Sequence, residues 1–587
     1  MFSQFASPSA ILRFTAPQAQ SEPLHAAFGE PMHTLVAYRP EEVSTLLNAA
    51  HQHAKAGRWC MGFVAFEAAA AFDAASELHA TAQYAPTPLA WFAVYDDAHA
   101  VPLPPESTTW QFAPWTTALT PTTFANKVDL IHHAIADGEV YQINLTSPLQ
   151  SRFEGDTRSL FEALCRAQPD SYAVYLDMGD TQVLSVSPEL FFDWREGQIL
   201  SRPMKGTASR GRTATLDQAQ AQALRDSSKE QAENLMIVDL IRNDISRIAL
   251  PFSVKVENLF ALQAWPTIWQ MTSDVRAKTR PGITLSDVFG ALFPCGSVTG
   301  APKVRAMHWI KQLEAQPRGV YCGAIGVLQP GGAATFNVAI RTLTIHGKKA
   351  RCGIGSGITA DATVGGEWQE WINKQGFLRR CEAPFDLLET FGLVGGQYPN
   401  LAPHLARLQE AAAHFSYPLD LSLVNQRLMS LAREHPLGSW RVRLCCDAVG
   451  GVNIQVFSLP AITTPVPVQL ANRPLLEADS EFVRFKTTRR SHYEVFAPST
   501  NDVFDTLLFN EAGELTEFTR GNVALLLDGQ WVTPQLDCGL LPGVGRAVAL
   551  RESRVVEGRI HRNDLARVQG LAFINSLRGW ISVELIK

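Results

Sequence analysis

The sequence lacks the features that mark several classes of protein. No apolar run approaches the roughly 20 residues that a membrane helix needs, and the opening MFSQFASPSAILRF has no basic flank followed by an apolar stretch. Lys and Arg number 51 against 57 Asp and Glu, for a net charge of −6, so the basic excess of nucleic-acid binders is missing. We therefore expect a cytoplasmic protein that binds neither nucleic acid nor membrane.

Cysteine is also scarce and unpatterned. The nine cysteines are odd in number and include no C-x-x-C pair, which suits neither a disulfide framework nor a structural zinc site. What the chain has in abundance is apolar side chains: 46% of its 587 residues are hydrophobic, with 31 Phe and 13 Trp. This composition predicts a globular protein with large buried cores and more than one domain.

Helix and strand patterns are mixed along the chain without strict alternation. A helical pattern at residues 123–140 precedes a strand pattern at 141–150, and further long helices are expected at 226–248 and 367–380. This mixture predicts an α+β fold. A break at CEAPFD, residues 381–386, divides the chain. The expected parts are an N-terminal part at 1–120, a catalytic domain at 121–381 and a further domain at 386–587.

Two pairs of glutamates have helical spacing. Glu230 and Glu233 in KEQAENLM, like Glu367 and Glu370 in GEWQEWINK, are three residues apart and share one helix face. Either pair alone is ordinary solvated surface. If the two helices converge, the four carboxylates need a divalent cation, and oxygen ligands of this kind suit Mg²⁺. Lys374, one turn beyond Glu370, could then meet an anion beside the metal.

Two further features point to an anionic ligand. GIGSGITAD, residues 353–361, has G-x-G-x-G spacing and no acidic residue at the right distance for a dinucleotide site, so we interpret it as a loop whose N–H groups approach an anion. Arg341 in FNVAIRTL is a charge inside an apolar strand pattern. Such a residue usually has an anionic partner.

Eight motifs in order resemble the chorismate-utilising enzymes, and most closely component I of the aminodeoxychorismate synthases. The motifs are DGEVYQINLTSPL, SVSPELFF, RPMKGTASRG, AENLMIVDLIRNDISRI, FPCGSVTGAPKVRAM, RGVYCGAIG, FNVAIRTL and GIGSGITAD. The resemblance covers about residues 1–380 and implies an α/β sandwich with large mixed or antiparallel sheets. It also implies that Glu233 and Glu370 bind Mg²⁺, with Glu230 and Glu367 in support through water, and that Glu189 is the general acid. The residues implied to bind substrate are Arg341, Tyr321, Lys374, Gly355 and Gly357.

Lys205 in RPMKGT separates the subfamilies. A lone lysine in a loop is ordinarily a solvated charge, but within this motif the aminodeoxychorismate enzymes carry lysine where anthranilate synthases carry a small or amide residue. A partly desolvated amine can have its pKa lowered enough to act as a nucleophile. The implied mechanism is attack of Lys205 on C2 of chorismate, loss of the C4 hydroxyl with a proton from Glu189, and addition of ammonia at C4. Gln142 stands where isochorismate and salicylate synthases place a water-activating lysine, which disfavours water. Gln270 replaces a histidine of many relatives.

The C-terminal part carries a second set of motifs. Lys486 alone could belong to a solvated basic cluster. Three motifs accompany it along the chain: H-x-x-R-L, E-x-x-x-G-N and L-P-G. Lysine and motifs in this order resemble the class IV, fold-type IV pyridoxal 5'-phosphate enzymes, especially 4-amino-4-deoxychorismate lyases. The resemblance implies that Lys486 forms the Schiff base and Glu517 pairs with the pyridine nitrogen. The other implied cofactor contacts are Arg407, Asn522, Val544 and Gly545, although Gly545 replaces a hydroxyl residue of many relatives.

The resulting expectation is a fused enzyme that makes 4-aminobenzoate for folate from chorismate and ammonia. No cysteine lies in the Gly-x-Cys-x-Gly elbow of a glutamine amidotransferase, so a separate glutaminase subunit is expected to supply ammonia. Two alternatives stay open. One is an anthranilate synthase fused to an aminotransferase; the other is an active synthase whose C-terminal domain is a non-catalytic scaffold, because that domain lacks the opening strand of free-standing relatives.

Overall fold

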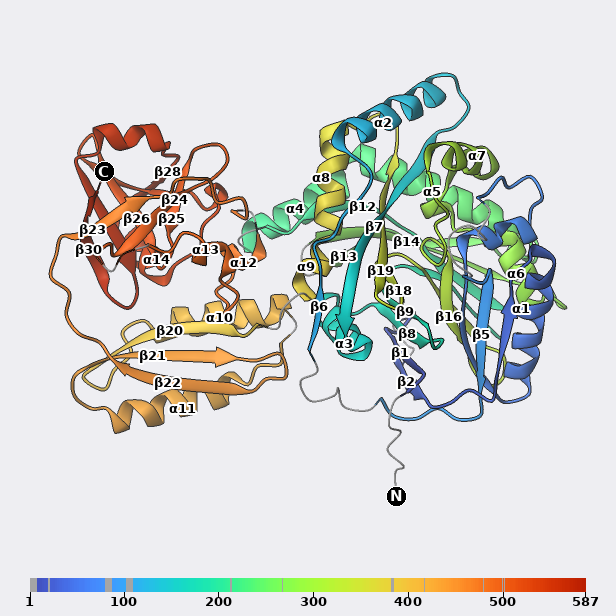
Figure 1. Cartoon of the computed structure of the whole chain (residues 1–587), viewed down its shortest axis with the longest axis horizontal. Coiled ribbons are helices and arrows are strands. Elements are labelled where there is room, and N and C mark those ends of the chain that lie inside the picture. The colour runs from blue at the N-terminus through green and yellow to red at the C-terminus, as the bar shows by residue number, and fades with distance from the viewer. Residues whose placement is uncertain are drawn as a thin grey trace. The chain divides into compact units, whose positions relative to one another are not determined.

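The chain divides into two compact units, Met1–Glu382 and Ala383–Lys587, in a computed structural model (Figure 1). The structure describes residues 8–18, 22–79, 87–101, 109–211, 214–265, 268–381, 385–415, 417–478, 480–498, 500 and 502–586. Residues 382–384 of the expected junction lie outside this set. No helix within the described ranges is long and apolar enough to cross a membrane.

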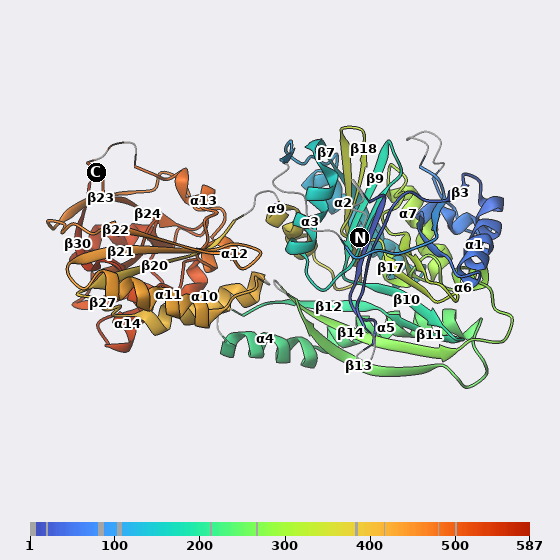
Figure 2. The same ribbon diagram turned by 90° about the horizontal axis from the view of Figure 1, so that it is seen from below.

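Two large sheets form the centre of the first unit (Figures 1 and 2). The first runs in the order β15-β7-β19-β18-β9-β8-β1-β2 with β6 beside β7: β1 (Ala10–Phe14), β2 (Leu24–Phe28), β6 (Trp110–Phe112), β7 (Gln142–Gly155), β8 (Tyr172–Asp177), β9 (Thr181–Ser187), β15 (Gly300–Ala301), β18 (Thr342–His346) and β19 (Lys349–Ile358). The second runs in the order β12-β14-β11-β10-β17-β16-β4-β5-β3 with β13 beside β14: β3 (His33–Ala37), β4 (Trp59–Val64), β5 (Ala90–Tyr95), β10 (Leu190–Arg195), β11 (Gln198–Arg202), β12 (Met204–Ser209), β13 (Lys255–Ala264), β14 (Ile268–Lys278), β16 (Ala324–Leu328) and β17 (Ala334–Val338). Each sheet therefore takes strands from both sides of residue 120.

The sheets pack face to face and helices cover their outer faces. On β1, Leu12 belongs to the core between the sheets together with Phe63, whereas its neighbour Ile11 joins the core under the outer helices. Because side chains alternate along a strand, both faces of the sheet are buried, as the apolar strand sequences require. The helices are α1 (Pro40–Lys55), α2 (Pro121–Ala136), α3 (Thr157–Ala167), α4 (Ala214–Asp226), α5 (Ser228–Ser246), α6 (Leu285–Leu292), α7 (Lys303–Leu313), α8 (Val364–Lys374) and α9 (Gly376–Cys381). The predicted α+β sandwich with large antiparallel sheets is confirmed.

Two local expectations were wrong. The helix expected at 367–380 is divided into α8 and α9, because the N–H of Gln375 bonds the Ile372 carbonyl at 3.2 Å and Gly376, a poor helix former, follows. The glycine-rich segment 353–361 is not a loop for most of its length. Residues up to Ile358 continue β19 and pair with β7.

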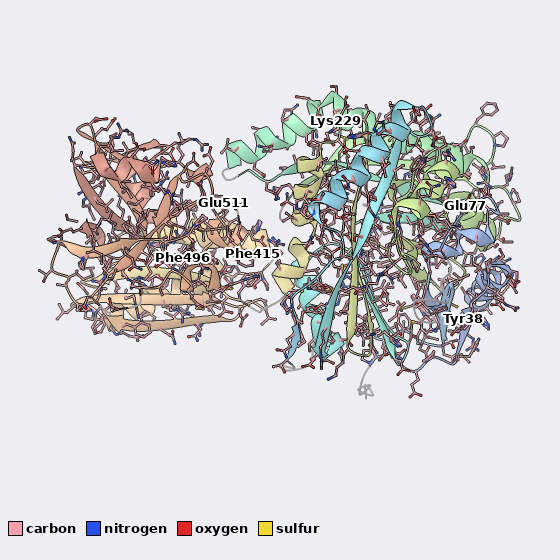
Figure 3. The ribbon with its side chains drawn as sticks, turned by 45° about the horizontal axis from the view of Figure 1, so that its top comes forward. Tyr38, Glu77, Lys229, Phe415, Phe496 and Glu511 are labelled. Carbon is pink, nitrogen blue, oxygen red and sulfur yellow. The ribbon has the colours of Figure 1, made fainter. Side chains whose placement is uncertain are left out.

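The second unit contains a small antiparallel sheet and a larger mixed one. The small sheet consists of β20 (Leu387–Val394), β21 (Ser439–Cys446) and β22 (Val452–Ser458), and packs with α10 (Leu401–Phe415) and α11 (Leu421–Glu434). The larger sheet has the order β25-β24-β23-β30-β29-β26-β27-β28: β23 (Val466–Leu470), β24 (Asp505–Phe509), β25 (Leu515–Phe518), β26 (Asn522–Leu527), β27 (Gln530–Pro534), β28 (Val556–Gly558), β29 (Gly570–Asn575) and β30 (Gly579–Leu585). Short helices α12 (Glu481–Arg484), α13 (Ser491–Glu494) and α14 (Val544–Arg551) complete it. Phe415 and Phe496, labelled in Figure 3, belong to the separate cores of the two sheets.

Candidate active sites

A cavity of about 450 Å³ in the first unit brings together every site residue that the sequence predicted for this part of the chain. Strand β12, helix α5, strand β19 and helix α8 each contribute to its wall. The predicted residues lining it are Glu189, Lys205, Glu230, Glu233, Tyr321, Arg341, Gly355, Gly357, Glu367, Glu370 and Lys374, and Gln270 lines it as well. These positions span more than 180 residues of sequence, so only the packing of distant elements gathers them.

The two expected glutamate pairs face this cavity, and one glutamate of each pair contacts a lysine. Lys205 Nζ lies 2.9 Å from Glu233 Oε2, and Lys374 Nζ lies 2.6 Å from Glu370 Oε1. Within the described residues, no three His, Cys, Asp or Glu side chains are arranged as metal ligands. Lys374 also donates to the Gly355 carbonyl at 3.0 Å, so the structure places it between β19 and α8.

The carboxylates interact electrostatically across the cavity. Burial raises the pKa of Glu230, and the charge of Glu233 raises it further. Burial also raises the pKa of Glu367. Glu370 is the opposite case: burial acts to raise its pKa, but Lys374 and Lys205 outweigh burial and lower it. The four carboxylates line one cavity, and carboxylate oxygens are the ligand type that Mg²⁺ prefers.

Lys205 differs from the sequence expectation in two respects. It lies on β12 rather than in a loop, and its side chain is only 19% exposed. Burial acts to lower its pKa, but Glu233, followed by Glu370 and Glu367, raises it above the ordinary value. Among these side chains the pKa is raised because the neighbouring carboxylates stabilise the ammonium more than burial destabilises it. A lowered pKa beside a bound metal and substrate stays a prediction.

The glycines of β19 leave space for functional side chains. A Cβ on Gly353 would lie 2.1 Å from the ring of Tyr321, and one on Gly357 would lie 2.8 Å from Gln142 Nε2 and 3.0 Å from Lys205 Nζ. Real Cβ atoms do not approach other atoms so closely. The glycines thus let the Tyr321 ring and the Lys205 amine pack against the strand.

Glu189 and Gln142 are buried polar groups with unsatisfied atoms. Burial raises the pKa of Glu189 to about 7, and its Oε1 has no hydrogen-bond partner. Neither side-chain polar atom of Gln142 has a partner among the described residues. Unpaired buried polar atoms are costly. Glu189 lines the cavity, so a polar ligand there would satisfy its Oε1.

Arg341 lies in a turn rather than a strand. It falls between β17 and β18 with a left-handed backbone, φ 49°. Its guanidinium donates to Gln168 Oε1, and burial, together with the nearby charge of Arg380, lowers its pKa to about 10. No carboxylate forms a salt bridge with Arg341 in the described part of the chain, so its charge is available to an anion in the cavity.

A larger cavity, of about 690 Å³, lies in the second unit. All the residues predicted to bind the cofactor line it: Arg407, Lys486, Glu517, Asn522, Val544 and Gly545. Burial, followed by the charge of Arg407, lowers the pKa of Lys486 to about 8. A lysine whose pKa is near neutrality can act as a base or nucleophile.

Glu517 is held by three donors. Tyr493 Oη donates to its Oε1 at 2.6 Å, the Leu541 N–H donates at 3.2 Å, and Asn522 Nδ2 donates to Oε2 at 3.4 Å. Burial raises the pKa of Glu517 to about 8. A protonated pyridine nitrogen beside this carboxyl would favour its ionised form, which fits pyridoxal phosphate.

Arg407 already has an acidic partner that the sequence analysis missed. Its Nε and Nη2 each donate to Glu389 at 2.8 Å, and His404 contacts the same carboxylate at 2.7 Å. Burial acts to raise the pKa of Glu389, but Arg407 and His404 outweigh it and lower that pKa. A charged residue inside an apolar sequence pattern was the signal that identified Arg341. The same signal, an acidic residue inside LLETFGLV, could have identified Glu389.

Close backbone packing explains why residue 545 is a glycine. A Cβ there would lie 2.5 Å from the Asn575 carbonyl carbon and 2.8 Å from the Ser576 nitrogen. The start of α14 therefore packs directly against the turn after β29, and a hydroxyl residue would not fit. The N–H groups of Val544 and Gly545 lie in the first turn of α14, where a helix leaves them unpaired.

Comparison with known proteins matches each of the two parts of the chain to a family. The family described as chorismate binding enzyme matches residues 12–380, which is more than half of the chain. This chain belongs to the chorismate-binding enzymes. The family described as amino-transferase class IV matches residues 386–586, so the chorismate-binding part is followed by a class IV part.

Relatives with two different names match this chorismate-binding enzyme about equally well. Aminodeoxychorismate synthase component 1 of Salmonella typhimurium is 40% identical over 260 residues, 44% of this chain and 57% of that protein. Anthranilate synthase component 1 of Aquifex aeolicus is 38% identical over 263 residues, which are 45% of this chain and 53% of that protein. The matches thus span little more than half the length of these relatives. The crystal structure of anthranilate synthase component I from Streptococcus pneumoniae TIGR4 has a TM-score of 0.52 at 25% identity, covering 63% of this chain and 90% of that one.

Proposed function

We propose that the first unit converts chorismate and ammonia to 4-amino-4-deoxychorismate, and that the second eliminates pyruvate from it to give 4-aminobenzoate for folate synthesis. The observation that carries the proposal is the Lys205 amine, which lies in the cavity of a chorismate-binding enzyme 2.9 Å from Glu233. Relatives named aminodeoxychorismate synthase component 1 support the first reaction. The class IV match, with Lys486 and Glu517 in one cavity, supports the second.

In the first reaction Lys205 attacks C2 of chorismate as the neutral amine, after losing a proton to solvent; Mg²⁺ bound to the glutamates would favour this form, because it offsets the charges that stabilise the ammonium. The ring double bonds shift, the C4–O bond breaks, and Glu189 gives its proton to the departing hydroxyl. Ammonia then forms a bond to C4, the double bonds return, and the Lys205 amine leaves C2. Arg341 and Tyr321 hold a substrate carboxylate. Glu233 and Glu370, with Glu230 and Glu367 behind them, would hold Mg²⁺, which when bound polarises a substrate carboxylate and offsets the glutamate charges.

In the second reaction Lys486 removes the proton from C4 of 4-amino-4-deoxychorismate. The C3–O bond breaks, pyruvate leaves and the ring becomes aromatic. Pyridoxal phosphate, when bound, supplies an electron sink conjugated with the substrate nitrogen. Glu517 would keep the pyridine nitrogen protonated, while Arg407 and the N–H groups of Val544 and Gly545 would hold the phosphate.

The test is to identify the product when the pure protein is loaded with pyridoxal phosphate and incubated with chorismate, Mg²⁺ and ammonium. We expect 4-aminobenzoate and pyruvate. Glutamine should replace ammonium only when a separate glutamine amidotransferase subunit is added. Anthranilate as the product would instead identify an anthranilate synthase, and accumulation of 4-amino-4-deoxychorismate without further conversion would identify the second unit as a scaffold.

Mg²⁺ removal should stop the first reaction. Glu233→Gln and Glu370→Gln should each abolish it as well, because each removes one of the charges that would bind the cation. Chorismate consumption in the presence of EDTA, followed by Mg²⁺ readdition, measures this. Asp239→Asn is the control, since Asp239 lies on the same helix α5 but is exposed and pairs with Arg242. Full turnover in excess EDTA would refute the metal requirement.

The first reaction should slow as pH rises through about 7. Glu189, whose pKa burial raises to about 7, is protonated and able to act as an acid only below that pH. Replacing it with Gln should lower kcat by about 10²- to 10⁴-fold and remove this limb of the pH profile. The measurement is kcat against pH at saturating ammonium. An unchanged alkaline limb in Glu189→Gln would assign the limb to another group.

A further inference from the structure

The cavity of the second unit has a strong excess of positive charge. Seven basic side chains line it, whereas Glu517 is the one acidic side chain among its lining residues. The basic residues are Arg407, Arg441, Arg443, Lys486, Arg490, Arg520 and Arg578. Apart from Arg407 and Lys486, which are expected to contact the cofactor, five positive charges remain, and they suggest that a further anion binds here.

Four of these arginines form no salt bridge among the described residues. One of them, Arg490, interacts electrostatically with Glu517, and the other three contact neutral groups. Arg441 lies over the Phe457 ring at 4.5 Å, Arg443 donates to Gln455 Oε1 at 3.1 Å, and Arg578 donates to the Pro460 carbonyl at 2.9 Å. No salt bridge to any of the three occurs among the residues that the structure describes. Arg407 and Arg520, in contrast, pair with Glu389 and Asp505. We call Arg441, Arg443 and Arg578 the arginine cluster.

The arginine cluster is built by two elements that are far apart in the sequence. Arg441 and Arg443 are two residues apart on β21 and so point to the same face, while Arg578 lies in the turn between β29 and β30. Burial, followed by the charges of Arg441 and Arg520, lowers the pKa of Arg578. The Arg578 guanidinium therefore repels those of Arg441 and Arg520, and an anion bound in the cavity would offset this repulsion.

The cofactor does not account for this charge. The groups expected to hold pyridoxal phosphate are Lys486, Glu517, Arg407 and the start of α14, which belong to other elements. The phosphate thus has its own guanidinium and its own helix N-terminus. The anion that the arginine cluster binds is therefore expected to be the substrate.

We propose that Arg441, Arg443 and Arg578 form a subsite for a dicarboxylate, and that this subsite selects substrates with two separated carboxylates. Guanidinium groups match carboxylates in charge and in two-point geometry. The proposal rests on the proposed function, because 4-amino-4-deoxychorismate has a ring carboxylate and a second carboxylate on its enolpyruvyl ether. A substrate with one carboxylate would leave part of the cluster unpaired.

The test measures equilibrium binding to the full chain loaded with pyridoxal phosphate, without turnover. The two probes are 3-(carboxymethoxy)benzoate, which has two carboxylates placed as in the substrate, and 3-methoxybenzoate, which lacks one of them. We expect the wild-type protein to bind the dicarboxylate at least about tenfold more tightly, since each added charge-assisted contact is worth about that factor. Arg441→Gln and Arg578→Gln should each remove most of this preference, and Arg441→Lys should keep part of it.

The control is Arg551→Gln, which removes the same charge from an exposed position on α14 outside the cavity lining. Retention of the visible cofactor absorbance shows that each variant is folded and loaded. Equal binding of both probes by the wild-type protein, or an undiminished preference in the cluster variants, would overturn the proposal. A wild-type preference that depends on the cluster, in a protein that produces no 4-aminobenzoate, would support the subsite while refuting the proposed function.

Discussion

Replacing Lys205 by alanine should reduce formation of 4-amino-4-deoxychorismate by several orders of magnitude while the protein stays folded. The reason is that Lys205 is the proposed nucleophile and no other amine has its position against Gly357 and Gln142. The fold should survive, because the carboxylate that loses its partner, Glu233, keeps a lysine 3.9 Å away, Lys229. The measurement is chorismate consumption with ammonium as donor, with thermal unfolding of both proteins for comparison.

Lys229 also provides the matched control. It lies in the first turn of α5, is labelled in Figure 3, and is more exposed than Lys205, at 46% against 19%. Lys229→Ala removes one positive charge near the same glutamate but leaves the nucleophile, so the rate should change little. A wild-type rate in Lys205→Ala would show that ammonia attacks chorismate directly and that Lys205 acts only through its charge.

Replacing Lys486 by alanine should separate the two reactions. The variant should accumulate 4-amino-4-deoxychorismate and release no pyruvate, because removal of the C4 proton needs an amine base and Lys486 is the lysine of the second cavity. The first reaction should continue at its wild-type rate, since its residues all belong to the other unit. Pyruvate release and the two amino products, followed in one reaction mixture, measure both effects.

The sequence offers a control for this experiment too. Lys587 is the other lysine within residues 387–587, and Lys587→Ala should leave both reactions unchanged. If Lys486→Ala converts purified 4-amino-4-deoxychorismate to 4-aminobenzoate at an undiminished rate, then Lys486 is not the base. The assignment of class IV chemistry to this unit would then be wrong.

Local sequence was sufficient to find most of the residues that the cavities collect. The i, i+3 spacing of Glu230 and Glu233 predicted a shared helix face, and α5 presents both to the cavity. The motif around Lys205 and the order of motifs around Lys486 identified residues that line the two cavities. Such predictions succeed because helical periodicity and short motifs depend on neighbours in the sequence.

Contacts between distant segments determined what the sequence analysis missed or mistook. The pKa of Lys205 rises because α5 and α8 bring carboxylates to β12, and folding pairs Glu389 on β20 with Arg407 on α10. Likewise the glycines of β19 belong to a strand because they pair with β7, and the Tyr321 ring and Lys205 occupy the space that side chains at Gly353 and Gly357 would need.

The sequence by itself determined the α+β class, the membership of its first part in a family and the identity of most site residues. Only the tertiary structure decided how those residues are charged, which of them pair with one another, and that β21 and the turn after β29 place unpaired arginines in one cavity. The physical reason is that electrostatic and packing energies depend on distances between side chains, and folding sets those distances between segments far apart in the chain.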